Sequence, residues 1–434
     1  NQNLKLSAGI SYNWAFRNIS LQPEYNYAYS YIKTDNPLYR LDKISGRDSS
    51  LFDRLPSATS ILATVLDNGN TYHFTEYQNS HQFNFCYRDL HSKLLKCEIS
   101  VNLPVRIAHA NLYYQRMGRH DVSRQSIFFE PNIWLRGNAW EIKAKMISEL
   151  PDLTTMVNYR DDSNPMNIIL GNTQLRNIHY YDIEGGKTFE GKKHSRLNIN
   201  MGYHQTDNAV AYSLVFDKQT GVSTVQPISV NGNYRIDLGI GYTRPLDKKE
   251  KLSIDNQAAF NYNHNVDMAM VQGATQSQRS IVNNWKISNV LKLNYRPDDN
   301  YEFTLHGGGT YYLIKSQREG FNNIHAGDYN IGMNVQITLP WKLQLTTDLT
   351  MFARRGYQLS EMNTTDWIWN TQLSRSFINK KLLVKLQGFD ILRQLSNTQY
   401  LMNAQGRTET WNNSIPRYVM LSLSWRFNVN PKKK

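Results

Sequence analysis

Hydrophobic and polar residues alternate with a period of two along most of the chain. In the first such segment every second residue is apolar or aromatic, from Leu4 to Trp14. The same alternation recurs in segments that begin at Tyr25, Leu197, Tyr234, Leu252, Tyr301, Trp341 and Val419. Successive side chains of a β-strand point to opposite faces, so each segment has one apolar and one polar face. No helical period of comparable length occurs, and the pattern predicts an all-β protein.

Two kinds of connection alternate between these segments. Short turns are expected at Arg17-Asn18 and Gly137-Asn138, whereas residues 34–70 and 150–176 form longer irregular stretches. Some strands, such as residues 284–296, exceed the roughly 9–11 residues that cross a bilayer when tilted. Short turns at one end and long loops at the other are typical of an outer-membrane β-barrel, whose turns lie in the periplasm.

The number of strands suggests that the barrel extends beyond this sequence. We count about 17 strands and predict an antiparallel transmembrane β-barrel over residues 1–428, followed by a basic tail, residues 429–434. The first strand runs down into a tight turn and the last ends on the same side, which gives an odd count, whereas bacterial single-chain barrels have an even number. We therefore expect the C-terminal part of a 22-stranded barrel, a size with a plugged lumen. The chain also opens without an export signal, as a mature chain or a fragment would.

Composition and charge narrow the class of protein further. The 434 residues include 27 Tyr, 16 Phe and 9 Trp, too many for a disordered chain, and no apolar window long enough for a membrane-spanning helix. The formal charge is +13, but Lys and Arg are spread along the chain rather than clustered, so the charge does not predict nucleic-acid binding. Mixed charges on the polar faces instead predict a solvated barrel interior.

Residues on the polar faces supply the candidates for ligand binding. The expected lumen-facing residues are Lys96, Glu98, Arg106, Lys143, His204 and Asp237. They are typical either of a solvated lumen wall or of a lumen that attracts a polar or anionic ligand. No nucleophile, base and orienting group can be assembled, so we do not expect an enzyme. We likewise expect no metal and no cofactor, because Asp161-Asp162 lacks a full calcium-loop spacing and suits an ordinary turn.

Two cysteines, Cys86 and Cys97, flank one of the short turns. Two cysteines alone exclude a disulfide-based scaffold or a cysteine-rich zinc module. Strand alternation places Cys86 on the lumen side and Cys97 on the lipid side. Residues bridged across a hairpin have to share a face, so the pattern predicts no disulfide unless a bulge changes the alternation.

Three segments carry motifs that resemble a known family. Residues 169–176, Ile-Leu-Gly-Asn-Thr-Gln-Leu-Arg, are similar to a Gly-Asn-Pro-x-Leu-Lys-Pro-Glu segment that enters a strand in the middle of the barrel. Residues 386–392 and 417–428 are similar to the penultimate and closing strands. Together they resemble the Bacteroidota outer-membrane β-barrel family related to TonB-dependent receptors. Thr173, Asn177-Ile178 and Arg393 depart from its motifs, and seven residues follow Phe427.

The resemblance implies a function and a set of partners. It implies uptake of an unknown ligand through a lumen plugged by an N-terminal domain that is absent from this chain, energised by a TonB-type energy transducer. A surface lipoprotein partner and contact with outer-membrane lipid and lipopolysaccharide also follow from it. The alternative is a structural or interaction barrel that acts as a scaffold in an outer-membrane protein assembly. The sequence upstream of Asn1 would separate the two, because a plug domain there supports transport.

Overall fold

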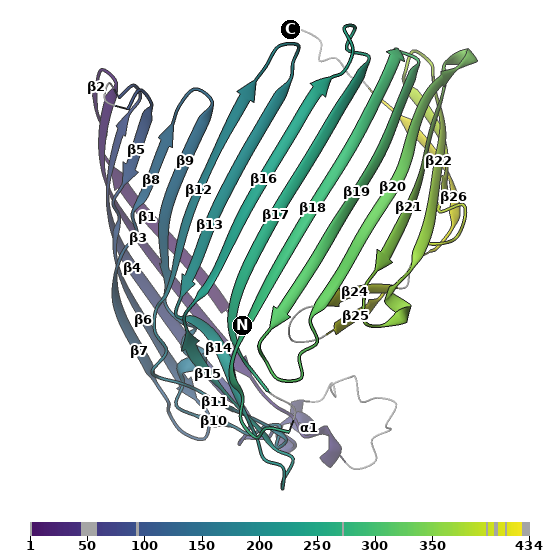
Figure 1. Cartoon of the computed structure of the whole chain (residues 1–434). Coiled ribbons are helices and arrows are strands. Elements are labelled where there is room, and N and C mark those ends of the chain that lie inside the picture. Colours follow the sequence, from purple (N-terminus) through teal and green to yellow (C-terminus); the bar gives the residue numbers. More distant parts are fainter. Residues whose placement is uncertain are drawn as a thin grey trace. The chain divides into compact units, whose positions relative to one another are not determined.

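The computed structural model describes residues 2–44, 59–92, 95–270, 273–395, 398–402, 407–412 and 415–427. Most of these residues belong to one sheet of 20 strands (Figure 1). The strands of this sheet are β1 Gln2–Ser11, β2 Trp14–Phe16, β3 Ile19–Asn36, β4 Tyr72–Asp89, β5 Glu98–Asn102, β6 Val105–Gln115, β7 Val122–Phe129, β8 Asn132–Arg136, β9 Trp140–Glu149, β12 Ile178–Glu190, β13 Arg196–Asp207, β16 Asn233–Pro245, β17 Leu252–Ala269, β18 Gln278–Asp298, β19 Tyr301–Ser316, β20 Ile324–Leu339, β21 Leu343–Arg355, β22 Thr365–Phe377, β23 Leu382–Phe389 and β26 Tyr418–Trp425.

The remaining elements are short and lie in the connections. Two small sheets contain β10 Arg160–Asp161, β11 Asn167–Leu170, β14 Ala209–Phe216 and β15 Ser223–Val230, and β24 Thr398–Met402 and β25 Arg407–Trp411. The helical elements are α1 Thr59–Thr64 and the single 3₁₀ turns η1 Leu41–Lys43, η3 Leu153–Met156, η4 Pro340–Lys342 and η5 Ser360–Met362. None of the helices in the described ranges is long and apolar enough to cross a membrane.

Two compact units divide the chain, and each is described by itself. Unit 1 consists of Asn1–Glu184, His204–Tyr234 and Val266–Ser280, and unit 2 of Gly185–Tyr203, Arg235–Asn265 and Ile281–Lys434. In unit 1, β3 pairs with β1 and β4, and β4 pairs with β5 and β6, which lead on to β8 and β7. In unit 2, β18 to β23 pair in chain order and β26 follows β23. All these pairs are antiparallel, which confirms the predicted antiparallel all-β class.

The 20 strands of the sheet correspond to 17 passes of the chain. The segments β1/β2, β5/β6 and β7/β8 each continue a single strand, because β3 pairs with both β1 and β2, and the register of β4 runs on unchanged from β5 to β6. The register from β5/β6 to β8/β7 is likewise continuous. The count agrees with the predicted number of about 17. Among the described residues of its own unit, β1 is paired with β3 alone and β26 with β23 alone.

The register separates an apolar from a polar face in each unit. In unit 2, Leu305, Met333 and Leu349 lie opposite one another on one face of β19, β20 and β21. Their sequence neighbours Thr304, Asn334 and Asp348 line up on the other face. On β26 the apolar residues Val419, Leu421 and Leu423 are 73%, 65% and 68% exposed. The sheet therefore presents its hydrophobic side chains outward to its surroundings, as a strand facing lipid does.

The structure agrees with the predicted position of Cys86 and corrects the predicted position of Cys97. Both Cys86 and Cys97 are free and buried. Cys86 lies on the polar face of β4, opposite Asn102, as the alternation predicts. Cys97 does not face lipid, because it precedes the first residue of β5 and its carbonyl accepts a hydrogen bond from the Ser92 backbone N–H. Strand alternation does not apply to Lys96 and Cys97, because both lie in the turn before β5.

Candidate functional site

A row of short side chains crosses the polar face of unit 1. The register places Ser7, Ala28, Ser80, Ala108 and Ser126 side by side on β1, β3, β4, β6 and β7. The next row towards the tight turns contains Gln82, Arg106 and Phe128, and the next row towards the loops contains Lys5, Gln78 and Arg124. Because long side chains stand on both sides of a row of short ones, the sheet surface is hollowed along this row.

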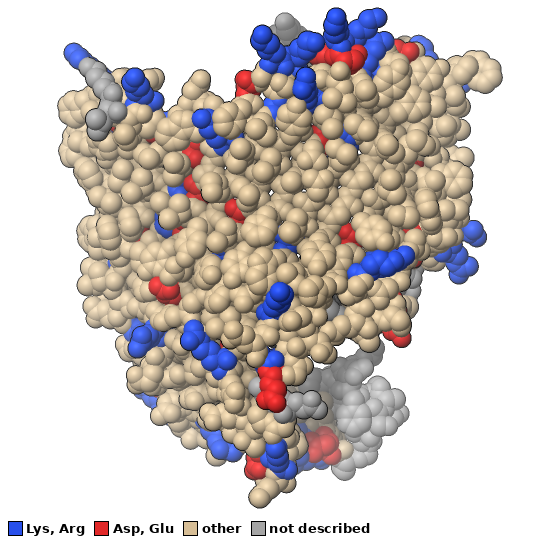
Figure 2. Space-filling model, in the orientation of Figure 1, with Lys and Arg blue, Asp and Glu red and all other residues tan. Residues whose placement is uncertain are grey.

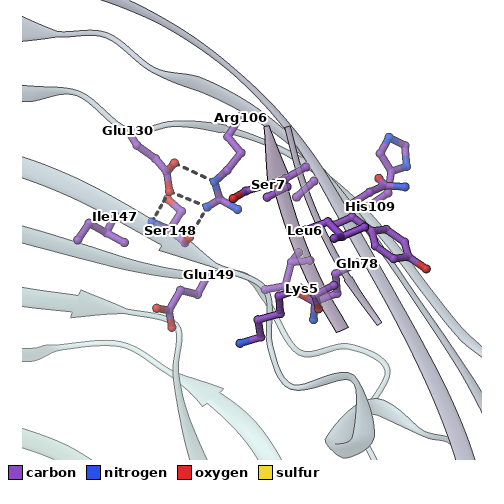
Figure 3. A pocket seen from close by; sticks show the side chains of 17 residues that line it. Lys5, Leu6, Ser7, Gln78, Arg106, His109, Glu130, Ile147, Ser148 and Glu149 are labelled. Carbon is purple, nitrogen blue, oxygen red and sulfur yellow. Dashed lines mark hydrogen bonds and ion pairs between the residues drawn. The ribbon is translucent and has the colours of Figure 1, made fainter. Parts of the chain in front are cut away.

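This hollow has a volume of about 800 Å³ (Figure 3). Its polar lining includes Lys5, Ser7, Gln78, Arg106, Glu130 and Glu149. The volume lies in the range of small-molecule sites, roughly 300–1,000 Å³. One lysine and one glutamate lie beside an Arg–Glu pair, so the formal charges of these groups cancel. The hollow thus suits a polar solute of low net charge that forms hydrogen bonds to hydroxyl, amide and charged groups.

Arg106 is the most firmly held of these side chains. Its Nε and Nη2 donate to Glu130 Oε2 and Oε1 at 3.0 and 2.7 Å, and Nη2 also donates to the Ser148 carbonyl at 2.5 Å (Figure 3). The guanidinium carbon lies 4.5 Å from the centre of the Phe128 ring. Glu130 Oε1 accepts a further hydrogen bond from the Ser148 backbone N–H at 2.8 Å. A two-point Arg–carboxylate pair with low exposure has a fixed geometry, so Arg106 forms a rigid wall of the hollow.

A packed segment borders the hollow on its loop side. Between β9 and β12, residues 150–177 fold back onto the polar face of β6 and β7, and we call this segment the inlay. Its buried apolar side chains pack against those of the sheet; the cluster consists of Ala110, Leu112, Tyr114, Val122, Leu153, Met156, Val157 and Leu175. Burying a large apolar side chain stabilises by about 1.5–3 kcal/mol. The inlay is thus a well-packed layer on the polar face and not a loose loop.

The motif at residues 169–176 fixes this inlay in place. A Cβ atom on Gly171 would lie 1.7 Å from the Val157 carbonyl oxygen, so only glycine fits there. Asn172 donates hydrogen bonds on two sides: its backbone N–H donates to the Thr155 carbonyl at 2.9 Å, and its Nδ2 donates to the Pro227 carbonyl at 2.8 Å. Leu175 is fully buried in the cluster. The motif therefore joins the inlay to β15, and β12 begins at Ile178, as the resemblance implies.

A buried arginine ties three loops together at the same end of unit 1. The side chain of Arg116 is 0% exposed and contacts Asp161 Oδ1 at 2.9 Å. It also donates to the Gly69 carbonyl and to Asn70 Oδ1, at 3.2 and 2.5 Å. Burial by itself raises the pKa of Asp161, but hydrogen bonds from Ser163 and the Arg116 guanidinium outweigh it and hold the pKa below its ordinary value. The Asp161 carboxylate is thus occupied by a structural ion pair.

Replacing Arg116 by methionine is expected to loosen these loops. Asn70 and the Gly69 carbonyl, both in half-buried residues, lose their donor, which costs at most about 1–3 kcal/mol for each group left unpaired. Hydrogen exchange should show faster opening of residues 66–71 and 159–163. Since the pKa of Asp161 is lowered in the folded protein, the pair stabilises the loops above about pH 3.9 and this contribution is lost as the pH falls further. The variant should show less of this acid dependence. Arg119→Met, at an arginine whose side chain is 70% exposed, is the matched control and should leave the exchange unchanged.

The structure places only one predicted candidate, Arg106, in the hollow. Glu98, at the start of β5, lies opposite Arg136. Lys143 contacts Glu141 at 3.2 Å, and its ammonium lies 5.7 Å from the centre of the Trp134 ring. These residues are on the polar face as expected, but they belong to a separate group near the tight turns.

The other three candidates also lie apart from the hollow. His204 Nδ1 contacts Asp182 Oδ1 at 2.6 Å, and Asp182 also pairs with Lys145 at 3.3 Å. Asp237, in unit 2, accepts hydrogen bonds from Arg235 and Asn261 at 2.7 and 2.5 Å. Lys96 corrects an expectation, because it precedes β5 in an exposed turn and has a left-handed backbone with a φ of 53°. Alternation cannot place a residue that is outside the strand.

Sequence reasoning missed Lys5, Glu130 and Ser148. Lys5 and Glu130 both fall on the polar positions of the alternation, so the pattern could have identified both as polar-face residues. Ser148 carried no such signal. In the described ranges, no group of three or more His, Cys, Asp or Glu side chains is arranged to hold a metal ion.

Comparisons with known proteins give the fold a name. Residues 274–425 match the model of the outer membrane protein beta-barrel family, which covers about a third of the chain. Two crystal structures from Pseudomonas aeruginosa, OccK11 (OpdR) and OccK5 (OpdH), are 12% and 9% identical to the chain. Each alignment covers 82% of this chain, and 94% and 96% of the respective chains, with a TM-score of 0.24. A search among curated proteins gave no match.

The family match agrees with the strands, turns and two-faced sheet described above. The matched residues run from the loop before β18 to the end of β26. They include the uninterrupted series of long antiparallel strands in unit 2. Taken together, the chain is an antiparallel outer-membrane β-barrel protein, it is located in the bacterial outer membrane, and its residues 274–425 match the outer membrane protein beta-barrel family.

Proposed function

We propose that this chain is the barrel of an outer-membrane transporter of TonB-dependent receptor type, which takes up a polar ligand through a plugged lumen. The observation that carries the proposal is the polar hollow of about 800 Å³ on the polar face of unit 1. A sheet that only anchored an assembly would need no shaped polar recess beside a rigid Arg–Glu pair. In a barrel the polar face lines the lumen, so the hollow would lie along the route of the ligand.

We assign the closure of the lumen and the supply of energy to two further parts. A plug domain upstream of Asn1 would close the lumen, and a TonB-type energy transducer in the inner membrane would rearrange it. Within the chain, the inlay and the three loops tied by Arg116 would form the entrance on the loop side. The hydroxyl, amide and charged groups of the hollow would replace part of the hydration of the ligand as it passes.

The proposal is tested by the permeability of the full-length protein in liposomes. With its plug, the protein should leave vesicles impermeable to arabinose and stachyose. After deletion of the upstream plug domain, both sugars should enter, and osmotic swelling followed by light scattering measures this. Folding of both forms is checked by the heat-dependent shift of the barrel in gel electrophoresis.

Two results would contradict transport through a plugged lumen. One is an upstream sequence without a plug domain, and the other is an unchanged permeability of a folded protein from which the plug was deleted. Either result would favour the alternative, a structural or interaction barrel that acts as a scaffold in an outer-membrane assembly.

A further inference from the structure

Two tight turns of unit 2 are unusually rich in cations. Residues 187–196, around the β12–β13 turn, and 244–251, around the β16–β17 turn, contain eight Lys or Arg and three Asp or Glu. Figure 2 shows blue side chains gathered at the end of the molecule where these turns lie. We call six of these residues the basic rim: Lys187, Lys192, Lys193, Arg244, Lys248 and Lys249.

Two of the three acidic groups are used inside the turns. Asp247 accepts hydrogen bonds from the backbone N–H groups of Leu252 and Lys249 at 2.9 and 3.2 Å, which lowers its pKa. Glu250 Oε2 contacts His194 Nδ1 at 3.1 Å, so it connects the second turn to the first. These two carboxylates hold the turns in shape, and within the described residues neither is paired with an ammonium group of the basic rim.

Four ammonium groups are left at the tips of the turns. Throughout the ranges that the structure describes, the ammonium groups of Lys192, Lys193, Lys248 and Lys249 have no hydrogen bond or ion pair, and all four residues are exposed. Lys193 and His194 have left-handed φ angles of 55° and 54°, and Glu250 has one of 55°, so the backbone of each turn is sharply bent. The bends carry the lysines beyond the last strand residues and away from neutralising partners.

The other two cations of the rim belong to the apolar face. Thr188 bonds to Asn198, and Thr243 to Asp255, on the polar face, so their neighbours Lys187 and Arg244 point to the opposite, apolar face. The Lys187 ammonium lies 4.7 Å from the centre of the Phe189 ring, which is two residues closer to the turn. Arg375 lies over Phe377 in the same way, at 4.8 Å, beside the β22–β23 turn. The side chains of Lys187 and Arg375 are therefore directed from the apolar face towards the turn end, as snorkelling side chains are.

We propose that the basic rim binds the phosphates of anionic glycerophospholipids in the leaflet on the turn side. Tight turns of outer-membrane barrels face the periplasm, so this leaflet is the inner one. Lys187 and Arg244 reach the phosphate level from the lipid-facing side, and the four tip lysines add a positive potential above it. This proposal depends on the location in the outer membrane and not on the transport function.

The position of the cations favours a lipid over an acidic protein as the partner. An acidic protein would be met by the tip lysines alone, since they extend furthest from the sheet. Lys187 and Arg244 instead lie on the face that carries exposed apolar side chains such as Ile183 and Ile240, which are 52% and 39% exposed. Aromatic rings next to cations at the end of an apolar band mark the interface between hydrocarbon and headgroups.

The test is site-specific crosslinking to lipid in reconstituted vesicles. The protein is placed in phosphatidylcholine vesicles that contain diazirine-labelled phosphatidylglycerol or diazirine-labelled phosphatidylcholine. After illumination, mass spectrometry gives the ratio of the two yields on the peptides that contain residues 187–196 and 244–251. The wild type should prefer phosphatidylglycerol, and added salt should weaken the preference, because screening lengths are about 8 Å at physiological ionic strength.

Two variants separate the lipid site from general effects on folding. Replacing Lys192, Lys193, Lys248 and Lys249 together by glutamine should lower the ratio at these peptides by about fivefold or more, the effect expected of even one lysine at an anionic surface. Lys187→Met with Arg244→Met should also lower it. The matched control is Lys286→Gln with Lys292→Gln, which removes cations from the polar face and should leave the ratio unchanged.

Folding of each variant is confirmed by heat-dependent mobility in gels. A wild-type ratio near one would overturn the proposal, and an acidic periplasmic protein would then be the better partner for the tip lysines. A preference that survives the removal of all four tip lysines and of Lys187 and Arg244 would overturn it as well. A fall of the same size in the polar-face control would also count against it, because the effect would then reflect net charge alone.

Discussion

Arginine in place of Met333 is expected to lower the free energy of unfolding in lipid vesicles by about 2–4 kcal/mol. Met333 lies in the middle of β20 on the apolar face, between Leu305 and Leu349, and is 47% exposed. A guanidinium at this depth has to leave water for hydrocarbon or draw water and headgroups towards it. Denaturant titrations of the protein folded into vesicles, followed by tryptophan fluorescence, measure the change.

The adjacent residue provides the matched control for this experiment. Asn334 lies at the same depth on the polar face, opposite Thr304 and Asp348. Asn334→Arg places the same charge beside a carboxylate on the solvated side, so it should cost less than about 1 kcal/mol. Equal losses for the two variants would mean that the apolar face is not the face in contact with lipid.

Gly171→Ala is expected to release the inlay from the polar face of unit 1. The added Cβ would meet the backbone of Val157, with the carbonyl oxygen at 1.7 Å and the carbonyl carbon at 2.7 Å, so no side-chain rotation relieves the clash. The inlay has to move, which uncovers Leu175 and Met156 and costs about 3–6 kcal/mol for two large apolar side chains. Hydrogen exchange followed by mass spectrometry should show lost protection over residues 150–177, while β20 and β21 keep theirs.

The same substitution at Gly307 serves as the control for the loss of a glycine. A Cβ there meets its nearest neighbour, the Asn330 carbonyl oxygen, at an ordinary 3.6 Å. Gly307→Ala should therefore change stability and exchange very little. Unchanged protection of residues 150–177 in Gly171→Ala would show that the motif does not hold the inlay in place.

Much of the sheet was predictable because alternation is a strong signal in long two-faced strands. The apolar positions of Leu4 to Trp14 and of Val419 to Phe427 assigned faces to β1 and β26 without any knowledge of their partners. Alternation fails where a strand ends or changes parity. Lys96 and Cys97 lie in the turn before β5, and the period of two continues through that turn by chance.

The hollow was not predictable from alternation, because it depends on register and on a change of parity. Ser7, Ala28 and Ser80 form one row only in the observed alignment of β1, β3 and β4. In β9, Lys145 pairs with Asp182, and Ser148 bonds to His179 beside Arg106. Both contacts are made on the polar face, although one residue has an odd number and the other an even number, so the alternation of faces changes between them. Such a break is set by local packing and leaves no trace in a hydrophobicity pattern.

The one-sided pairing of β1 and β26 has a practical consequence for purification and refolding. Among the described residues of its own unit, each of these strands is paired along one edge only, β1 with β3 and β26 with β23, so the amide and carbonyl groups of the other edge have no partner strand within that unit. In hydrocarbon such groups cost several kcal/mol each, so they have to meet further backbone in the membrane. Outside the membrane the same two margins are templates for foreign β-structure. Preparations should therefore be kept dilute and in detergent or lipid, so that the exposed strand edges of two molecules rarely meet and pair.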